Sequence, residues 1–146
     1  MNLSEKALDI IHKHASEAFP NECVGFLYGK ETGDDRSITV ANPIHNSKDG
    51  DQRRRFEVSP LDYMKAEQFG DDNDLTLLGV YHSHPLHPAI PSAHDLKQAV
   101  PFFSYIITSV NEERTNIDTT SWRLADDGSQ FEKEILKTEK LLEISE

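Results

Sequence analysis

The sequence has a single cysteine, Cys23, among its 146 residues. One thiol excludes an internal disulfide framework and a zinc site with four cysteine ligands, the two common uses of cysteine in small domains. Positive charge is also scarce, because 15 Lys and Arg stand against 26 Asp and Glu and give a net charge of −11. A field of that sign repels phosphate backbones, so we expect no nucleic acid among the partners.

Long apolar runs are missing as well. Charges interrupt residues 1–19, which therefore do not resemble a signal peptide. No stretch approaches the roughly 20 apolar residues that a membrane-spanning helix needs. We predict a cytoplasmic protein that does not interact with membranes. With 36% hydrophobic residues, the chain is long enough for one domain with its own core and too short for two ordinary ones.

The hydrophobic pattern predicts a mixed α/β domain. Apolar residues at helical spacing indicate helices, and apolar runs bounded by glycine, proline or polar turns indicate strands. Helices are expected over 4–18, 61–69, 92–100 and an acidic end after 135, and strands over 24–29, 38–41, 56–58, 75–84, 105–110, 119–124 and 131–135. The strand 75–84 is apolar on both faces, which is typical of a central strand flanked by helices. The sequence thus predicts a three-layer α/β or α+β domain over 1–136, followed by an acidic tail, 137–146.

Histidines are clustered in one short segment of the sequence. His82, His84, His87 and His94 lie within thirteen residues. Side chains alternate along a strand, so His82 and His84 project to the same face and their imidazoles converge. Asp95 falls in the first turn of the next predicted helix and brings a carboxylate near the end of that strand. Two imidazoles and one carboxylate suit a catalytic zinc ion, which often takes three protein ligands and keeps a position for water.

Each of these residues also has a structural interpretation. Paired histidines occur in cores and at surfaces without metal, and Ser92 with Asp95 matches a capping box at a helix start. Other catalytic patterns are absent: there is no HExxH, one cysteine cannot supply the PCxxC of nucleobase deaminases, and no serine lies in a nucleophile elbow. Cys23 as a nucleophile stays open, although its neighbours show no activating pattern.

The string HSHP at 82–85, with Pro91-Ser92 and then Asp95 after it, resembles the motif of the JAMM (MPN+) zinc metallopeptidases. The similarity runs from about residue 3 to residue 135 and is strongest to compact, stand-alone prokaryotic members. It implies a single MPN/JAB-like domain of the cytidine-deaminase-like type, with a central mixed sheet flanked by helices.

The resemblance also implies roles for individual residues. His82, His84 and Asp95 would hold one zinc ion per chain, with water in the fourth position. Glu22, in the string NECVGFLYG, matches the family's glutamate after the first helix and would be the general base that later protonates the leaving amine. Ser92 matches the family's serine and would donate a hydrogen bond to the oxyanion.

Family members cleave peptide or isopeptide bonds after the C-terminal Gly-Gly of ubiquitin-like proteins, and the compact prokaryotic ones are associated with ubiquitin-like sulfur carriers. We therefore expect a carrier of this kind as substrate, its extended tail adding to a sheet edge beside the zinc. The only basic run, Arg53, Arg54 and Arg55 in the polar loop 46–55, is the candidate contact for the carrier or its tail, unless it is simply a solvated loop. His87 and His94 match no ligand of the family and are predicted to be bystanders.

Two other functions stay open. One is zinc-dependent hydrolysis of small peptides or amides without a ubiquitin-like partner, which no motif in the sequence separates from the first. The other is a non-catalytic MPN scaffold domain, and the presence of all five matched site residues counts against it. The sequence carries no signal of an oligomeric state.

Overall fold

The structure is a computed structural model that describes residues 1–53 and 55–139. Its helices are α1 (Glu5–Ala18), α2 (Pro60–Asp72) and α3 (Ala93–Gln98). Its strands are β1 (Asn2–Ser4), β2 (Val24–Thr32), β3 (Asp35–Ile44), β4 (Thr76–Pro85), β5 (Ser104–Val110), β6 (Asn116–Leu124), β7 (Phe131–Glu134) and β8 (Lys137–Glu139). They form one mixed sheet in the order β7-β6-β5-β4-β2-β3-β1-β8. No helix in these ranges is long and apolar enough to cross a membrane.

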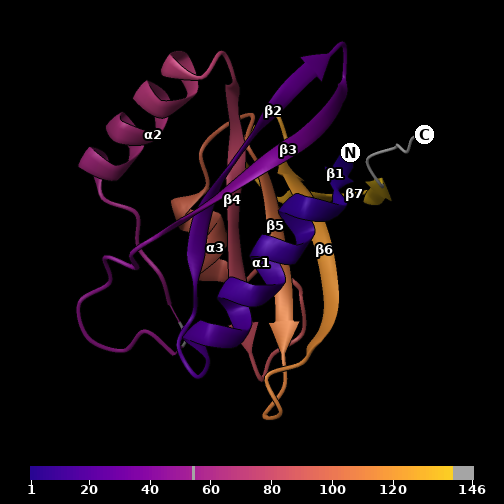
Figure 1. Cartoon of the computed structure of the whole chain (residues 1–146). Helices are drawn as coiled ribbons and strands as arrows, with labels where there is room; N and C mark the ends of the chain where they lie inside the picture. Colours follow the sequence, from indigo (N-terminus) through magenta and orange to yellow (C-terminus); the bar gives the residue numbers. More distant parts are fainter. Residues whose placement is uncertain (54, 140–146) are drawn as a thin grey trace.

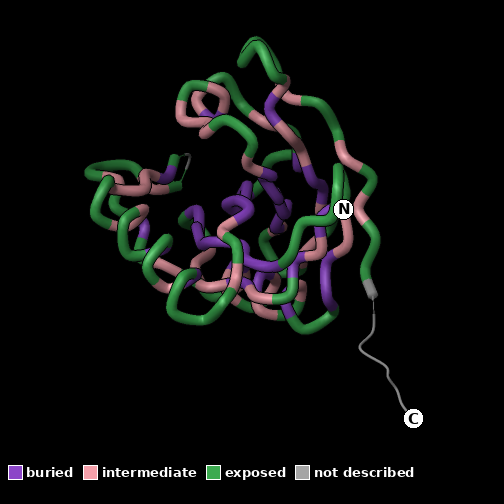
Figure 2. Tube along the Cα trace, turned by 90° about the horizontal axis from the view of Figure 1, so that it is seen from above, coloured by how far each residue is buried: buried purple, intermediate pink, exposed green. Residues whose placement is uncertain are grey.

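The helices cover both faces of the sheet and so make three layers. Figure 1 shows α1 across the front of the sheet and α3 behind it. The α1 face buries Ala7, Ile11 and Ala15 of the helix against the sheet, while Phe26 and other sheet residues pack toward α2 on the opposite face. Seen from above, the buried positions gather between the layers and the exposed ones lie outside (Figure 2). The predicted mixed α/β fold with a helix-flanked sheet is confirmed.

The strand β4 is the centre of this sheet. It pairs antiparallel with β2 on one side and parallel with β5 on the other. Side-chain alternation places Tyr81 in the core beneath α1 and Val80 in the core on the α2 side. His82 and His84 follow Val80 at intervals of two and continue on the α2 side. The central position predicted from the apolar residues of this strand is therefore correct.

The expectation of a sheet edge beside the two histidines stays a prediction. The ends of the described sheet are β7 and β8, and β4 is the fourth strand from one end of the order and the fifth from the other. Its ladder with β2 ends at the pair Val24–His82, whereas its ladder with β5 continues to Pro85, so His84 lies beyond the ladder with β2.

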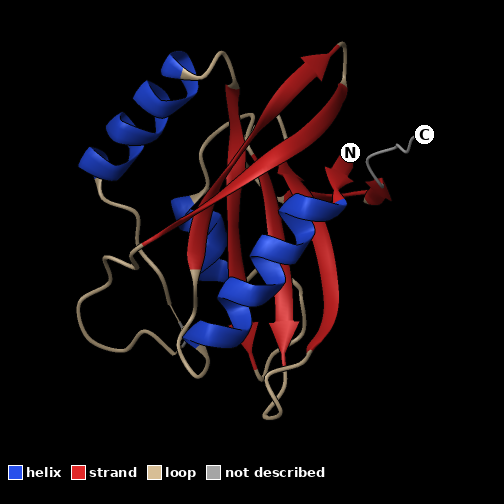
Figure 3. Ribbon diagram, in the orientation of Figure 1, coloured by secondary structure: helices blue, strands red, loops and turns tan. Residues whose placement is uncertain are grey.

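Two local predictions fail. Residues 56–58 form no strand, but lie in the long loop between β3 and α2 (Figure 3). Phe56 is buried because its ring packs on His82, with centroids 4.5 Å apart, and not because its backbone pairs. Residues 137–139 form β8, parallel to β1, where the sequence predicted an acidic helical end. The rest of that predicted tail, 140–146, lies outside the described residues.

Candidate metal centre

The structure brings together the three residues that the sequence predicted as ligands. The Nε2 atoms of His82 and His84 are 3.2 Å apart. Asp95 Oδ2 lies 3.3 Å from His82 Nε2 and 3.2 Å from His84 Nε2. All three residues are buried, and within the described ranges they are the one group of histidine, cysteine and acidic side chains whose ligand atoms converge.

This triangle has the size that zinc coordination requires. Ligand atoms at about 2.0–2.1 Å from zinc in a tetrahedron lie about 3.3 Å from one another. Two imidazole nitrogens and one carboxylate oxygen leave the fourth position open, as in catalytic sites rather than closed structural ones. The residues therefore fit a zinc ion in both donor type and spacing.

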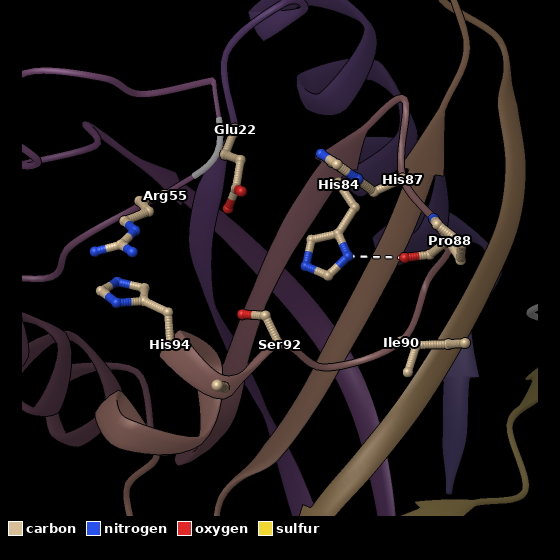
Figure 4. A pocket seen from close by; sticks show the side chains of 9 residues that line it. Glu22, Arg55, His84, His87, Pro88, Ile90, Ser92 and His94 are labelled. Atoms are coloured by element: carbon tan, nitrogen blue, oxygen red, sulfur yellow. Dashed lines mark hydrogen bonds between the residues drawn. The ribbon is translucent and has the colours of Figure 1, made fainter.

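Hydrogen bonds at His84 and Asp95 turn the donor atoms of these two residues toward the centre of the triangle. His84 Nδ1 lies 2.8 Å from the carbonyl oxygen of Pro88, which can only accept, so Nδ1 carries the hydrogen and Nε2 offers a lone pair (Figure 4). Ser92 N–H donates to Asp95 Oδ2 over 2.8 Å, and Asp95 N–H donates to Ser92 Oγ over 3.0 Å. This capping box begins α3. Asp95 thus caps the helix and faces the histidines with the same oxygen.

The electrostatics of the triangle favour a positive charge at its centre. Burial lowers the pKa of His82, which keeps that ring neutral. Burial alone would raise the pKa of Asp95, but the two histidines and the Ser92 N–H hold the pKa of this carboxyl well below its usual range. Burial alone would lower the pKa of His84, as it does for His82. The hydrogen bonds to Asp95 and to the Pro88 carbonyl outweigh burial and raise the pKa of His84. An ionised Asp95 beside a neutral His82 attracts a cation, as metal binding requires.

Glu22 lies next to the triangle, just before β2, with its carboxyl group turned into the pocket (Figure 4). Its N–H donates to the Gln52 carbonyl over 2.7 Å, and Asn46 Nδ2 donates to the Glu22 carbonyl over 3.2 Å. The residue is only 4% exposed, and its Oε1 has no hydrogen-bond partner among the described residues. The backbone is thus fixed by the loop 46–55 while the carboxyl group stays available.

Burial raises the pKa of Glu22 to about 8, with His84 opposing the shift and Asp95 adding to it. A carboxyl group with that pKa can take up and release a proton near neutral pH. The neighbouring Cys23 lies on the α1 side of the sheet, where burial raises the pKa of its thiol to about 12. The alternative of a Cys23 nucleophile is therefore disfavoured.

A pocket of about 600 Å³ opens over the site. Its lining comprises Glu22, Arg55, His84, His87, Pro88, Ile90, Ser92, Ala93 and His94. The two histidines predicted as bystanders thus stay outside the triangle but face the pocket. The basic run divides. Arg53 and Arg55 are both exposed, but only Arg55 lines the pocket, and Arg54 lies outside the described residues.

Comparison with known proteins agrees with this geometry. Residues 4–125 match the family described as prokaryotic homologs of the JAB domain. The chain belongs to this family. Its predicted place among compact prokaryotic JAMM/MPN proteins is confirmed, and this JAB-family protein is accordingly an enzyme of the JAMM type.

Two relatives from prokaryotes are similar to a large part of this chain. The Haloferax volcanii protein named "Desampylase" is 33% identical over 124 residues, which cover 79% of this chain and 84% of that protein. The Thermus thermophilus protein named "Probable TtuB-protein conjugate cleaving protease" is 33% identical over 100 residues, covering 68% of this chain and 64% of that protein.

Solved structures share the fold over nearly the whole chain. A protein of Desulfitobacterium hafniense superposes with a TM-score of 0.83 at 32% identity, covering 97% of this chain and 94% of that one. A JAB1/MPN domain protein of Archaeoglobus fulgidus has a TM-score of 0.58 at 20% identity, covering 94% of this chain and 98% of that one, and it bears on the fold alone. The predicted MPN/JAB-like fold is therefore correct.

Proposed function

We propose that this JAB-family protein uses one zinc ion per chain to hydrolyse the amide bond after the C-terminal Gly-Gly of a ubiquitin-like or sulfur-carrier protein. The observation that carries the proposal is the triangle of His82, His84 and Asp95, at 3.2–3.3 Å, beside the buried carboxyl group of Glu22. The similarity to proteins named as a desampylase and as a TtuB-protein conjugate cleaving protease supports this class of substrate.

The proposed mechanism assigns a task to each site residue. His82, His84 and Asp95 are the residues that would hold the metal. When bound, zinc supplies a Lewis acid and lowers the pKa of water to about 7. Glu22 accepts a proton from the attacking water and passes that proton to the leaving amine.

Ser92 is assigned to the oxyanion. Its Oγ already accepts a hydrogen bond from Asp95 N–H, so its own hydroxyl hydrogen is left to donate into the pocket that Ser92 lines. We expect Ser92→Ala to lower kcat by about 10²–10³-fold, the effect of losing one oxyanion donor. The lost helix cap should also lower the free energy of unfolding by about 1 kcal/mol.

Steady-state kinetics and urea unfolding measure these two effects of Ser92→Ala separately. Ser92→Thr is the matched control, since threonine keeps both the hydroxyl donor and the cap. A Ser92→Ala enzyme with unchanged kcat would remove the oxyanion assignment even if its stability fell.

The substrate class is tested with a ubiquitin-like carrier that bears a C-terminal extension after Gly-Gly. We expect the zinc-loaded protein to release the extension, read by intact mass as a carrier ending in Gly-Gly, and to stop when a chelator removes the metal. An intact carrier together with rapid hydrolysis of small peptide amides would instead support the hydrolase without a ubiquitin-like partner. No hydrolysis of either substrate would support the scaffold domain.

A further inference from the structure

One side of the pocket is built from hydrogen-bond donors. Arg55 from the loop after β3 and His94 from α3 both line it, and Figure 4 shows the guanidinium of Arg55 turned toward the His94 ring. His84, Pro88 and Ile90 line the opposite side (Figure 4). The carboxyl group of Glu22 lies between the two sides.

The hydrogen bonds of Gln98 fix which nitrogen of His94 carries its hydrogen. Gln98 Nε2 donates to the Phe56 carbonyl over 3.0 Å, so this atom is the amide nitrogen and not the amide oxygen. The same nitrogen lies 2.5 Å from His94 Nε2, which must therefore accept. The neutral ring then carries its hydrogen on Nδ1. His94, like Arg55, has only a donor left to offer.

Arg55 is held in place at its backbone, while its side chain forms no ion pair with the described residues. Asn46 Nδ2 donates to the Arg55 carbonyl over 3.1 Å, and the bond from Gln98 to Phe56 ties the next residue to α3. No carboxylate in the described ranges lies within 4.0 Å of the guanidinium. Arg55 is exposed, so its guanidinium is a solvated cation at the active-site pocket and is free to bind an acceptor of the substrate.

We propose that Arg55 and His94 bind the α-carboxylate of the leaving group, so that the enzyme prefers to release a C-terminal amino acid over cleaving an isopeptide to a lysine side chain. This inference rests on the proposed function. Glu22 protonates the leaving amine, which therefore departs beside Glu22, where the donor pair lies. The α-carboxylate is two bonds from that nitrogen, whereas in an isopeptide four methylenes separate the nitrogen from the lysine backbone.

The reaction itself is an ordinary hydrolysis. The amide C–N bond breaks, and the oxygen of water joins the carbonyl carbon to leave a Gly-Gly carboxylate. Both protons of the water end on the leaving amine, which departs as an ammonium group. The planar fork of the guanidinium matches a carboxylate in two parallel hydrogen bonds, which a lysine or glutamine cannot reproduce. Arg55 thus acts as a specificity residue, with no part in the bond-breaking step.

The test compares three substrates made on one ubiquitin-like carrier: Gly-Gly-Ala with a free carboxylate, Gly-Gly-Ala carboxamide, and Gly-Gly joined to the Nε of a lysine peptide. We expect kcat/KM for the free carboxylate to exceed each of the others by about 10–100-fold, the usual effect of a charge-assisted hydrogen bond. Arg55→Gln should lower both ratios by about 10-fold, since it removes the charge-assisted hydrogen bonds of the guanidinium and leaves only His94 as a donor. Arg53→Gln, in the same loop but outside the pocket lining, should keep the wild-type ratios.

The outcomes separate this inference from the function on which it rests. Equal kcat/KM for the three substrates, or faster cleavage of the isopeptide, overturns the carboxylate site and leaves the proposed function standing. Ratios that survive Arg55→Gln also overturn it. Cleavage of none of the three by zinc-loaded wild type overturns the proposed function and the inference with it.

Discussion

Replacement of Glu22 by glutamine is expected to abolish hydrolysis while the metal stays bound. Glutamine has nearly the same shape as glutamate, but it can neither take a proton from water nor pass one to the leaving amine. Removal of a positioned acid–base group costs about 10²–10⁴-fold in rate. Because the substitution removes the group that carries out both proton transfers, the fall in kcat should lie at the upper end of that range.

The metal content of Glu22→Gln should match wild type, since the three ligand atoms already meet without Glu22. Metal analysis of the purified variant together with single-turnover kinetics on the Gly-Gly carrier measures both effects. A Glu22→Gln protein that retains hydrolysis would defeat the general-base assignment. A variant that loses its zinc would show instead that Glu22 contributes to metal binding.

The same substitution has an expected signature in stability. An unfolded glutamate releases its proton near pH 4.5, whereas burial raises the pKa of Glu22 to about 8 in the folded protein. The folded state holds the extra proton between these values, so the contribution of Glu22 to stability falls as pH rises through them. In metal-free protein we expect the free energy of unfolding of Glu22→Gln to rise, relative to that of wild type, by up to about 1.4 kcal/mol per pH unit between these two pKa values. Above the higher value the difference should stay constant.

The second large effect is expected from His84→Ala, which should remove both zinc and activity. His84 Nε2 lies within 3.2 Å of both other ligand atoms, and alanine would leave a two-residue site. Zinc content should fall from near one per chain to near zero. The gain in thermal stability on adding zinc, about 2.7 kcal/mol when free zinc is 100 times its Kd, should disappear with it.

His87→Ala is the matched control for His84→Ala. His87 lines the same pocket, with its ring 6.5 Å from that of His84, but it stands outside the triangle of ligand atoms. We therefore expect His87→Ala to keep its zinc and its zinc-dependent stabilisation. Full metal in His84→Ala would remove His84 from the ligand set, and loss of metal in His87→Ala would add His87 to it.

The arrangement of the ligands could be predicted from local rules. Alternation along an apolar strand puts His82 and His84 on one face, and a helix that starts just after the loop brings Asp95 back to that face. Glu22 was different, because a single glutamate before a strand has no pattern of its own and only the family resemblance singled it out. Its burial and its contact with the loop 46–55 depend on tertiary packing.

The features that the sequence did not predict also depend on contacts between segments far apart in the chain. The strands β1 and β8 have three residues each, which is too short for a period of two to be recognised, and they are stabilised by pairing with each other. Phe56 looked like part of a strand because it is apolar, but it is buried by the His82 ring. Arg55 and His94 come from segments far apart in sequence and meet only in the folded pocket.

The most direct test of the central claim is a zinc titration of the metal-free protein, followed by release of the extension from a Gly-Gly carrier. We expect no release without metal, then activity that rises in proportion to added zinc and reaches a plateau at about one equivalent per chain. Full activity in the chelated protein, or none at saturating zinc, would contradict the claim.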